Sequence, residues 1–217
     1  MTAFPSPNFG ERRDGARPSL IVLHYTAMPT CAEAEARLCD PAAEVSAHYL
    51  VSEAGRVTAL VPEAARAWHA GAGAWGGVTD VNSHSIGIEL ANTGDAPFPE
   101  PQMTALERIL RETMARWAIP PQGVIGHSDM APGRKRDPGP RFDWRRLART
   151  GLAVWPGPGG DRAADFRVRA RAFGYPDLPA KTLLAAFRLR FRPQATGPED
   201  AADRAMIDDL ARRFPQA

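Results

Sequence analysis

The chain has 217 residues, 44% of them hydrophobic, and its formal net charge at pH 7 is +2. This length and composition allow a substantial core, so we expect a globular protein with one large domain or one medium domain and a small appendage. A charge so near zero gives no argument for a nucleic-acid or membrane partner, and no stretch reaches the roughly 18–20 apolar residues of a membrane span. The N-terminus lacks the apolar segment of a secretory signal, so we expect a cytoplasmic protein, or a periplasmic one if a leader has been removed.

The first regular elements are a strand and a helix. The apolar run SLIVL at 19–23 is rich in branched residues and predicts a buried strand with His24 at its carboxyl end. An Ala/Glu-rich helix is predicted over 30–39. On that helix Cys31 and Cys39 would lie roughly 12 Å apart, beyond the about 7 Å reach of a disulfide. We therefore expect free thiols.

A hairpin and a long loop follow. Alternating apolar residues over 46–54 and 56–62 predict two paired strands. The glycine-rich stretch 66–82 is predicted to be a loop, and loops of this length inside a compact domain are usually functional. Its residues Trp68 and Trp75 are interpreted either as core anchors or as platforms for stacking on a sugar.

The next strand is predicted over 84–91, where isoleucines and a leucine alternate with Gly87 and Glu89. Glu89 therefore faces away from the apolar side, and the missing side chain of Gly87 would leave room for a substrate. Apolar residues at helical spacing predict a helix over 101–118, and a short strand is expected at 124–125.

The stretch 123–144 is the most unusual part of the chain. An apolar strand run gives way there to a loop rich in proline and glycine that carries His127, Lys135 and Asp137. His24 also follows an apolar strand run, so parallel strands would bring both imidazoles to one sheet edge. Two nitrogens and one oxygen with an open fourth position are typical of catalytic zinc.

The last third of the chain changes pattern. Residues 155–160 have the composition of a linker, and helices are predicted over 165–173, 182–192 and 199–214. We therefore predict an α/β fold with a mixed central β-sheet flanked by helices, followed by a small C-terminal three-helix domain. The predicted domains are residues 1–156 and 160–217.

The C-terminal segment is rich in positive charge. Arginines that alternate along the helix predicted over 182–192 spread around it instead of forming one stripe. We interpret the segment as a solvated basic face, with binding of an anionic glycan or of nucleic acid as alternatives. The basic residues in question are Arg162, Arg167, Arg169, Arg171, Lys181, Arg188, Arg190 and Arg192.

Several motifs together resemble one family. They are HYT at 24–26, SAHYLV at 46–51, RAWHAG at 66–71, NSHSIGIEL at 82–90 and IGHSDMAPGRKRDPGPRFDW at 125–144. Their order is the one seen in zinc-dependent N-acetylmuramoyl-L-alanine amidases. The likeness is to the branch with the cytosolic muropeptide-recycling and the outer-membrane-anchored enzymes, and it covers about residues 5–156. The segment 160–217 resembles the helical peptidoglycan-binding domain of the anchored enzyme.

The resemblance implies a peptidoglycan-recognition/amidase-like fold and an enzyme that hydrolyses the amide bond between N-acetylmuramic acid and L-alanine. It implies Zn²⁺ as the cofactor, with His24, His127 and Asp137 as its ligands. It further implies Glu89 as general base and acid and Lys135 as the stabiliser of the oxyanion. The partner would be peptidoglycan or a muropeptide, with no nucleic acid and no membrane span, and we expect a monomer.

Other interpretations of these residues stay open. Taken by themselves, Glu89 could be a surface carboxylate, Lys135 a solvated cation and Asp137 a turn former. His69 and Asn82 flank the long loop and could contact the sugar or the peptide stem. A non-catalytic peptidoglycan-recognition protein is the alternative function, although such proteins usually lack a ligand that this chain retains. Intact sacculus and released anhydromuropeptide are both open as substrates.

Overall fold

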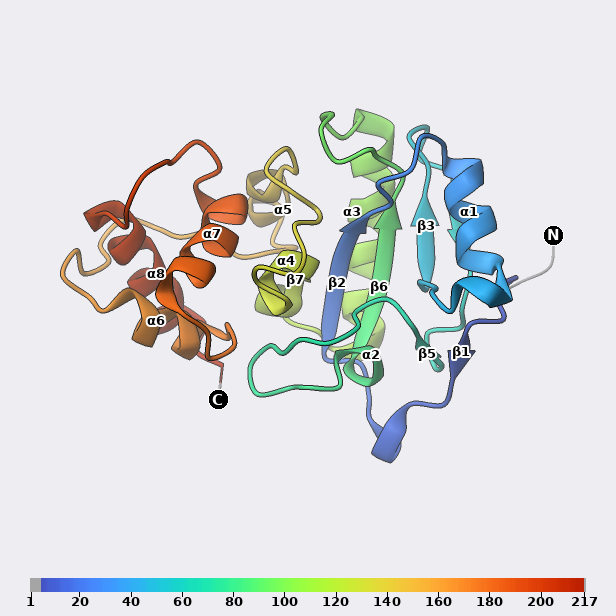
Figure 1. Ribbon diagram of the computed structural model, residues 1–217, viewed down its shortest axis with the longest axis horizontal. Coiled ribbons are helices and arrows are strands. Elements are labelled where there is room, and N and C mark those ends of the chain that lie inside the picture. Colours follow the sequence, from blue (N-terminus) through green and yellow to red (C-terminus); the bar gives the residue numbers. More distant parts are fainter. Residues whose placement is uncertain (1–4, 217) are drawn as a thin grey trace.

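The computed structural model describes residues 5–216 and centres on one five-stranded β-sheet (Figure 1). Four of its strands run parallel, and the edge strand β4 pairs antiparallel with β3. In sheet order the strands are β4 (Val57–Ala59), β3 (Tyr49–Val51), β6 (Ser85–Leu90), β2 (Leu20–Tyr25) and β7 (Val124–Gly126). A separate ribbon pairs β1 (Phe9–Gly10) with β5 (Arg66–Ala67).

Helices cover both faces of the sheet. In Figure 1, α3 lies behind the strands, α1 lies beside β3, and α6, α7 and α8 gather at the opposite end of the molecule. The helices are α1 (Cys31–Cys39), α2 (Val81–His84), α3 (Glu100–Trp117), α4 (His127–Met130), α5 (Trp144–Arg149), α6 (Phe166–Phe173), α7 (Ala180–Phe191) and α8 (Ala201–Arg213). None of these described helices is long and apolar enough to span a membrane. The predicted mixed α/β fold is confirmed, and both cysteines on α1 are free thiols.

The alternation of side chains along the strands separates two environments. Ile21 of β2 joins Ile86 and Ile88 of β6 in a core with α3. The intervening residues of each strand face the other way, and the parallel register pairs His24 with Glu89. One face of the sheet is therefore a continuous apolar core, and the other carries polar side chains near the carboxyl ends of its strands.

Apolar packing flanks the polar face at both ends. Leu50 of β3 belongs to a small cluster with Leu38 of α1. At the other end, Leu20 and Val22 of β2 belong to a cluster that continues into α6, α7 and α8, where it includes Phe187. The hydrophobic core thus runs across the predicted boundary between the two domains. The boundary itself stays a prediction.

The predicted solvated basic face is wrong for two of its arginines. Arg188 and Arg190 of α7 are buried, and each forms an ion pair with a buried aspartate. Arg192 also pairs with aspartates of the same segment. The helical pattern predicts which way an arginine side chain points. It does not predict which carboxylate from another part of the chain will lie next to that arginine in the fold. The segment therefore carries fewer free positive charges than its sequence suggests.

A largely buried carboxylate ties the sheet to α3. The side chain of Glu63 is 12% exposed. It accepts hydrogen bonds from the Tyr49 hydroxyl at 2.8 Å, the Trp117 indole at 2.7 Å and the Arg116 guanidinium at 2.8 Å. Burial by itself would raise the pKa of Glu63, but these hydrogen bonds lower it to about 2. The folded state therefore favours the ionised form more than the unfolded chain does.

We predict that Glu63 makes stability depend on pH in the acid range. A carboxyl group with a lowered folded-state pKa stabilises the fold above its unfolded pKa of about 4.3, and this contribution is lost as the pH falls toward the folded value of about 2. Glu63→Gln should cost about 2 kcal/mol at pH 7 and flatten this loss, as measured by urea unfolding at several pH values.

Glu112→Gln is the matched control, because the one ion pair of Glu112 among residues 5–216 is an exposed pair with Arg108 on the surface of α3. It should change the free energy of unfolding by less than about 0.5 kcal/mol and leave the pH profile unchanged. Parallel pH profiles for Glu63→Gln and the unmodified protein would contradict the assignment.

Candidate metal centre and active site

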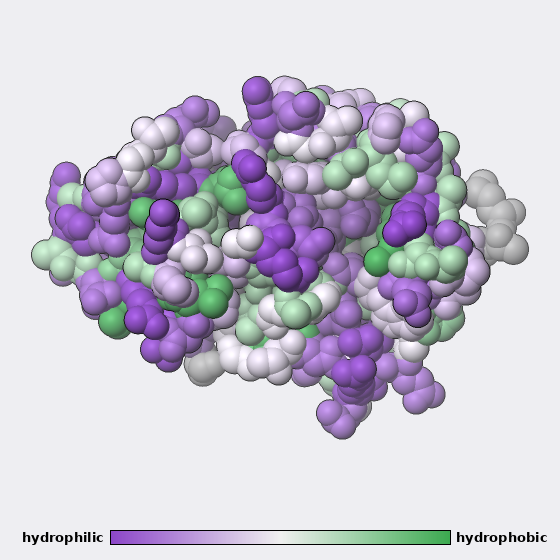
Figure 2. All heavy atoms as spheres, viewed as in Figure 1, coloured by the Kyte–Doolittle hydropathy of each residue, from purple (hydrophilic) through white to green (hydrophobic). Residues whose placement is uncertain are grey.

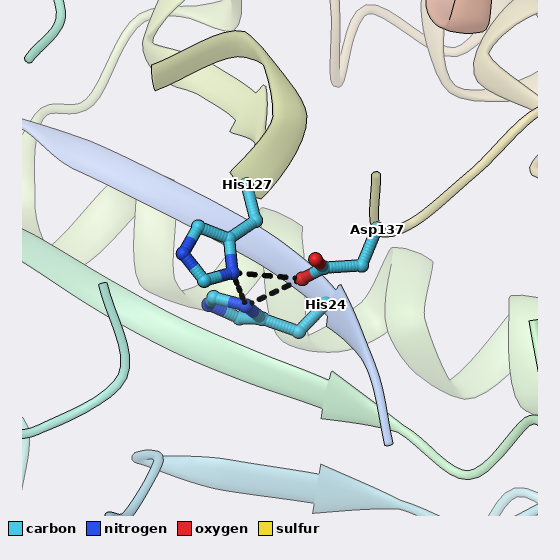
Figure 3. Close-up of side chains that lie close together, drawn as sticks. All are labelled: His24, His127 and Asp137. Atoms are coloured by element: carbon cyan, nitrogen blue, oxygen red, sulfur yellow. Dashed lines mark hydrogen bonds and ion pairs between the residues drawn. The ribbon is translucent and has the colours of Figure 1, made fainter. Parts of the chain in front are cut away.

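Three side chains from distant parts of the chain meet at the polar face of the sheet (Figure 3). His24 comes from β2, His127 is the first residue of α4 directly after β7, and Asp137 follows in the loop beyond α4. His24 Nδ1, His127 Nδ1 and Asp137 Oδ2 lie 2.9 Å from one another. All three residues are buried. The predicted parallel strands do bring the two imidazoles to one edge of the sheet.

The outer nitrogens of both imidazoles are hydrogen-bond donors. His127 Nε2 lies 2.9 Å from the Ala70 carbonyl oxygen, which can only accept. The Ser85 hydroxyl donates to a backbone carbonyl and so accepts from His69 Nε2. His69 Nδ1 is therefore the acceptor for His24 Nε2 at 3.0 Å. Because a neutral imidazole has one donor and one acceptor nitrogen, both inner Nδ1 atoms direct lone pairs at the carboxylate.

Three lone pairs that converge with no hydrogen between them repel one another unless a cation lies among them. Burial, then the proximity of His127, lowers the pKa of His24 to about 4, although Asp137 acts in the opposite direction. Neutral imidazoles and an ionised carboxylate are the forms that bind a metal ion. Two imidazole nitrogens and one carboxylate oxygen could together hold a divalent metal ion.

Glu89 lies beside this cluster on the neighbouring strand. Its Cα is paired with that of His24 across β2 and β6, and its Oε2 atom is buried with no hydrogen-bond partner among the described residues. Burial, and secondarily the charge of Asp137, raises the pKa of Glu89 to about 8, while Lys135 acts against that rise. A carboxyl group in this range can take up and release a proton near neutral pH.

The cluster opens into a cavity of about 450 Å³. Its walls come from the end of β2, from α1, from the loop around Trp68 and from the cationic run that contains Lys135. Figure 2 shows hydrophilic side chains gathered over the middle of this face, in the region of α4 and β2. Trp68 lines the cavity, whereas Trp75 is buried in the core as an anchor. A cavity of this size with polar groups on its floor suits a small polar ligand.

The structure gives His69 and Asn82 different places. His69 lines the cavity and hydrogen-bonds His24. Asn82 lies outside the lining, and its Oδ1 accepts the backbone N–H groups of His69 and Ala70. The Asn82 side chain therefore holds the loop that carries His69, and a direct contact of either residue with substrate stays a prediction.

The ring of His69 occupies the space beside Gly87. A Cβ atom at Gly87 would lie 2.5 Å from Cγ of His69, so the histidine ring packs directly on the strand. The expectation that Gly87 leaves space for substrate is wrong for this reason. The contact requires a residue without a side chain, because the ring has the sheet on one side and a hydrogen-bond partner at each of its two nitrogens.

Sequence reasoning missed two residues of the site. Ser85 sets the tautomer of His69 from the start of β6, and no local pattern distinguishes it from any other strand serine. Arg134 donates to the Ala70 carbonyl at 2.7 Å, the same oxygen that accepts from His127. The one signal for Arg134 in the sequence is its place in the cationic run that directly precedes Asp137.

The fold and the site define a class of protein, namely an α/β enzyme with a cluster of metal-binding character at the carboxyl edge of a mostly parallel sheet. A family model described as N-acetylmuramoyl-L-alanine amidase matches residues 14–140. The chain belongs to the N-acetylmuramoyl-L-alanine amidase family.

Two curated relatives and one solved structure support this membership. The N-acetylmuramoyl-L-alanine amidase AmiD of Escherichia coli K12 is 36% identical in an alignment that covers 92% of this chain and 84% of its own. The 1,6-anhydro-N-acetylmuramyl-L-alanine amidase AmpD of Salmonella typhimurium SL1344 is 35% identical over 66% of this chain and 86% of its own. The structure of Escherichia coli AmiD with the substrate anhydro-N-acetylmuramic acid-L-Ala-D-gamma-Glu-L-Lys superposes with a TM-score of 0.83 at 33% identity, covering 97% of this chain and 99% of that one.

We predict that Gly87→Ala destabilises the protein through His69. The added methyl group cannot coexist with the ring, and such overpacking costs about 1–3 kcal/mol. The same change in a His69→Ala background should cost less by at least about 1 kcal/mol, because the clashing ring is absent. Urea unfolding of the two single variants and the double variant measures this coupling. Additive costs would show that the ring does not pack against the strand at this position.

Proposed function

We propose that this chain is a zinc-dependent amidase that hydrolyses the bond between N-acetylmuramic acid and L-alanine. The observation that carries the proposal is the set of three converging lone pairs from His24, His127 and Asp137. Beside them lies a carboxyl oxygen of Glu89 that has no hydrogen-bond partner among the described residues. A non-catalytic recognition protein would have no use for a proton acceptor at this place. The enzyme is therefore favoured over the binding module.

Zinc would be held by His24 Nδ1, His127 Nδ1 and an oxygen of Asp137. When bound, it would supply a water molecule whose pKa is lowered to about 7, so that a nucleophile is available at neutral pH. The two outer hydrogen bonds of the imidazoles fix the rings in the required tautomer. Partners of this kind typically tune both the affinity for the metal and its reactivity.

Glu89 would act as the general base and then as the general acid. In the hydrolysis, its carboxylate accepts the proton of the attacking water and returns it to the departing amine of the L-alanine residue. The raised pKa of Glu89 suits this double task, and a cation bound nearby would keep enough of the group ionised. Its Oε2 atom accepts no hydrogen bond from any described residue, so this oxygen of the carboxyl group is not committed to another partner.

Lys135 would stabilise the charge that develops on the carbonyl oxygen. It lines the cavity two positions before Asp137 and makes no ion pair or side-chain hydrogen bond among residues 5–216. A cation held at the mouth of a partly buried site is effective against a developing oxyanion. The positive charge of Lys135 is therefore available to the transition state.

The proposed substrate class is the anhydromuropeptide. The solved AmiD complex contains an anhydro-N-acetylmuramic acid tripeptide as substrate, and AmpD is described as a 1,6-anhydro-N-acetylmuramyl-L-alanine amidase. The cavity of about 450 Å³ beside the cluster suits a ligand of the size of one sugar with the first residue of its stem peptide. The cytoplasmic location, the monomeric state and glycan binding by residues 160–217 stay predictions.

We predict that the purified protein releases L-Ala-D-γ-Glu-L-Lys from the anhydro-N-acetylmuramic acid tripeptide, as measured by liquid chromatography and mass spectrometry. Exhaustive treatment with EDTA should abolish the release, and stoichiometric zinc should restore it because the three ligands are preformed. Purified sacculi as a second substrate report whether intact peptidoglycan is also cut. Full activity after removal of all metal would refute the zinc assignment.

Two substitutions separate the proton carrier from the electrostatic stabiliser. Glu89→Gln keeps the shape of the side chain but cannot accept a proton, so kcat should fall by about 10²–10⁴ while zinc remains bound. Lys135→Met should lower kcat by about 10²–10³ with little change in zinc affinity. Lys181→Met removes an exposed lysine of α7 that does not line the cavity, so it is the control and should change kcat by less than about 2-fold. Loss of zinc from Glu89→Gln would instead make Glu89 a ligand.

A further inference from the structure

A buried ion pair joins the C-terminal helices to the segment that carries a predicted ligand. Arg190 of α7 places its Nη1 atom 2.7 Å from Oδ2 of Asp129 in α4. The Arg190 side chain is 1% exposed and that of Asp129 is fully buried. Arg190 also donates to the Val124 carbonyl at 3.3 Å, and its guanidinium lies 4.0 Å from the ring centre of Trp144. One arginine of the helical segment thus contacts β7, α4 and α5.

Asp129 accepts a second hydrogen bond from the C-terminal helical segment and a third from the backbone of the turn that precedes α4. Its Oδ1 accepts from the Tyr175 hydroxyl at 2.7 Å. Its Oδ2 accepts from the backbone N–H of Gly126 at 2.8 Å, which closes the turn between β7 and α4. His127 is the next residue along the chain. The carboxylate therefore fixes the backbone at the position where the chain turns to present the imidazole.

The same short helix also reaches the second ligand of this loop. The backbone N–H of Ser128 donates to the Asp137 carbonyl at 2.9 Å. A displacement of α4 would thus move the His127 ring and the Asp137 backbone together. Because the three predicted ligand atoms lie 2.9 Å apart, even a small shift of α4 changes their spacing enough to weaken a bound metal ion.

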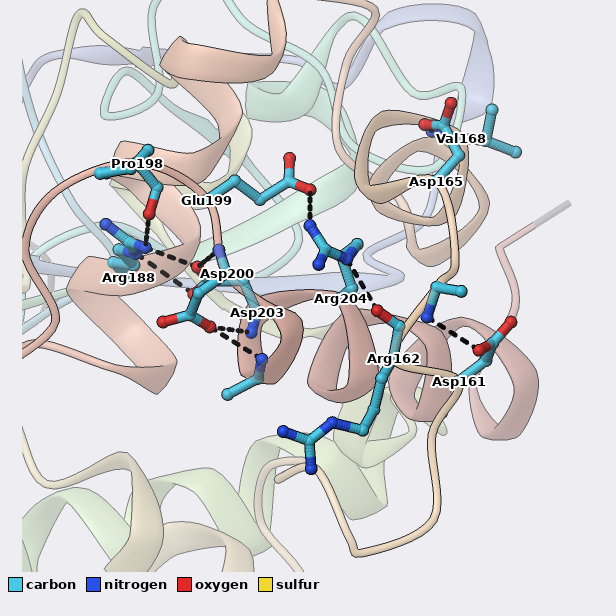
Figure 4. A network of polar contacts seen from close by, with 12 residues as sticks. Asp161, Arg162, Asp165, Val168, Arg188, Pro198, Glu199, Asp200, Asp203 and Arg204 are labelled. Atoms are coloured by element: carbon cyan, nitrogen blue, oxygen red, sulfur yellow. Dashed lines mark hydrogen bonds and ion pairs between the residues drawn. The ribbon is translucent and has the colours of Figure 1, made fainter.

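The position of the Arg190–Asp129 ion pair indicates that it holds α4 in place in addition to packing the two segments together. A buried ion pair gives little net stability compared with apolar residues of similar volume, and removing one partner leaves an uncompensated charge. α7 carries a second buried arginine, Arg188, which pairs with Asp203 at 2.5 Å (Figure 4). Arg188 donates its other hydrogen bonds to the backbone carbonyls of Gly197 and Pro198, just before α8. All these contacts therefore lie within the C-terminal helical segment. Among the ion pairs of residues 5–216, only that of Arg190 connects α7 to the turn before His127.

We propose that Arg190 and Tyr175 are positioning residues for the metal centre, acting through Asp129. The C-terminal helical segment is then a part of the catalytic unit that sets the geometry of α4, in addition to any role in binding the cell wall. This inference rests on the proposed zinc site. It assigns the helices a function that their resemblance to a peptidoglycan-binding domain does not include.

The experiment compares two arginine variants of the same helix in the full chain. Arg190→Met should raise the zinc dissociation constant, measured by competition with a chromophoric chelator, by about 10-fold or more. Arg188→Met is the matched control, because it breaks another buried pair of the same helix that lies away from α4, and it should leave the dissociation constant within about 2-fold. Tyr175→Phe removes one bond to Asp129 without leaving an unpaired charge, so it should weaken zinc binding in the same direction even if Arg190→Met does not fold. Arg190→Lys should recover part of the affinity.

A second measurement does not need zinc. In the metal-free protein, amide hydrogen exchange at Gly126 and Ser128 should be faster in Arg190→Met and Tyr175→Phe than in the unmodified protein, and unchanged in Arg188→Met. Equal dissociation constants and equal exchange rates for the Arg190 and Arg188 variants would overturn the proposal. If the unmodified protein binds no zinc, the proposed function fails, while the exchange rates still decide whether Arg190 holds α4.

Discussion

The site depends on one electrostatic constraint, which is that three lone pairs converge on one point. The hydrogen bonds on the far side of each imidazole, to His69 and to the Ala70 carbonyl, leave the inner nitrogens of His24 and His127 without hydrogens. Asp137 adds a carboxylate oxygen at the same distance. Such an arrangement is unfavourable by itself and favourable around a cation. The outer hydrogen bonds of the imidazoles therefore determine that the site favours a metal ion.

The sheet makes this arrangement available by dividing its two faces. Ile86 and Ile88 bury one face under α3, which leaves the alternate positions of the same strand free for Gly87 and Glu89. Glycine at the first of these positions admits the His69 ring, and the carboxyl group at the second lies on the strand next to the first histidine ligand. A shift of the strand register by one residue would exchange the two faces and destroy both the core and the site.

The helical segment is bound to the catalytic half by two kinds of contact. A shared hydrophobic cluster joins Val22 of β2 to Phe187 of α7, and its apolar burial supplies most of the attraction. Arg190 and Asp129 add a directional contact within that interface, because a hydrogen-bonded ion pair restricts the geometry of its partners. The apolar cluster thus brings the two halves together, and the ion pair specifies how they meet.

The five strands of the main sheet and the longer helices could be predicted from the residues alone. Buried parallel strands such as β2 form continuous apolar runs, half-buried strands alternate, and helices repeat about every 3.6 residues. The one-turn helices α2 and α4 and the short α5 were missed because they are too short to show a period. The five motifs between residues 24 and 144 indicated the family and the reaction type, because each motif is a run of consecutive residues. The role of Ser85, the filling of the space at Gly87 and the burial of Arg190 could be seen only in the folded structure. These depend on contacts between distant segments: periodicity indicates which way a side chain points, and the fold decides which partner it meets there.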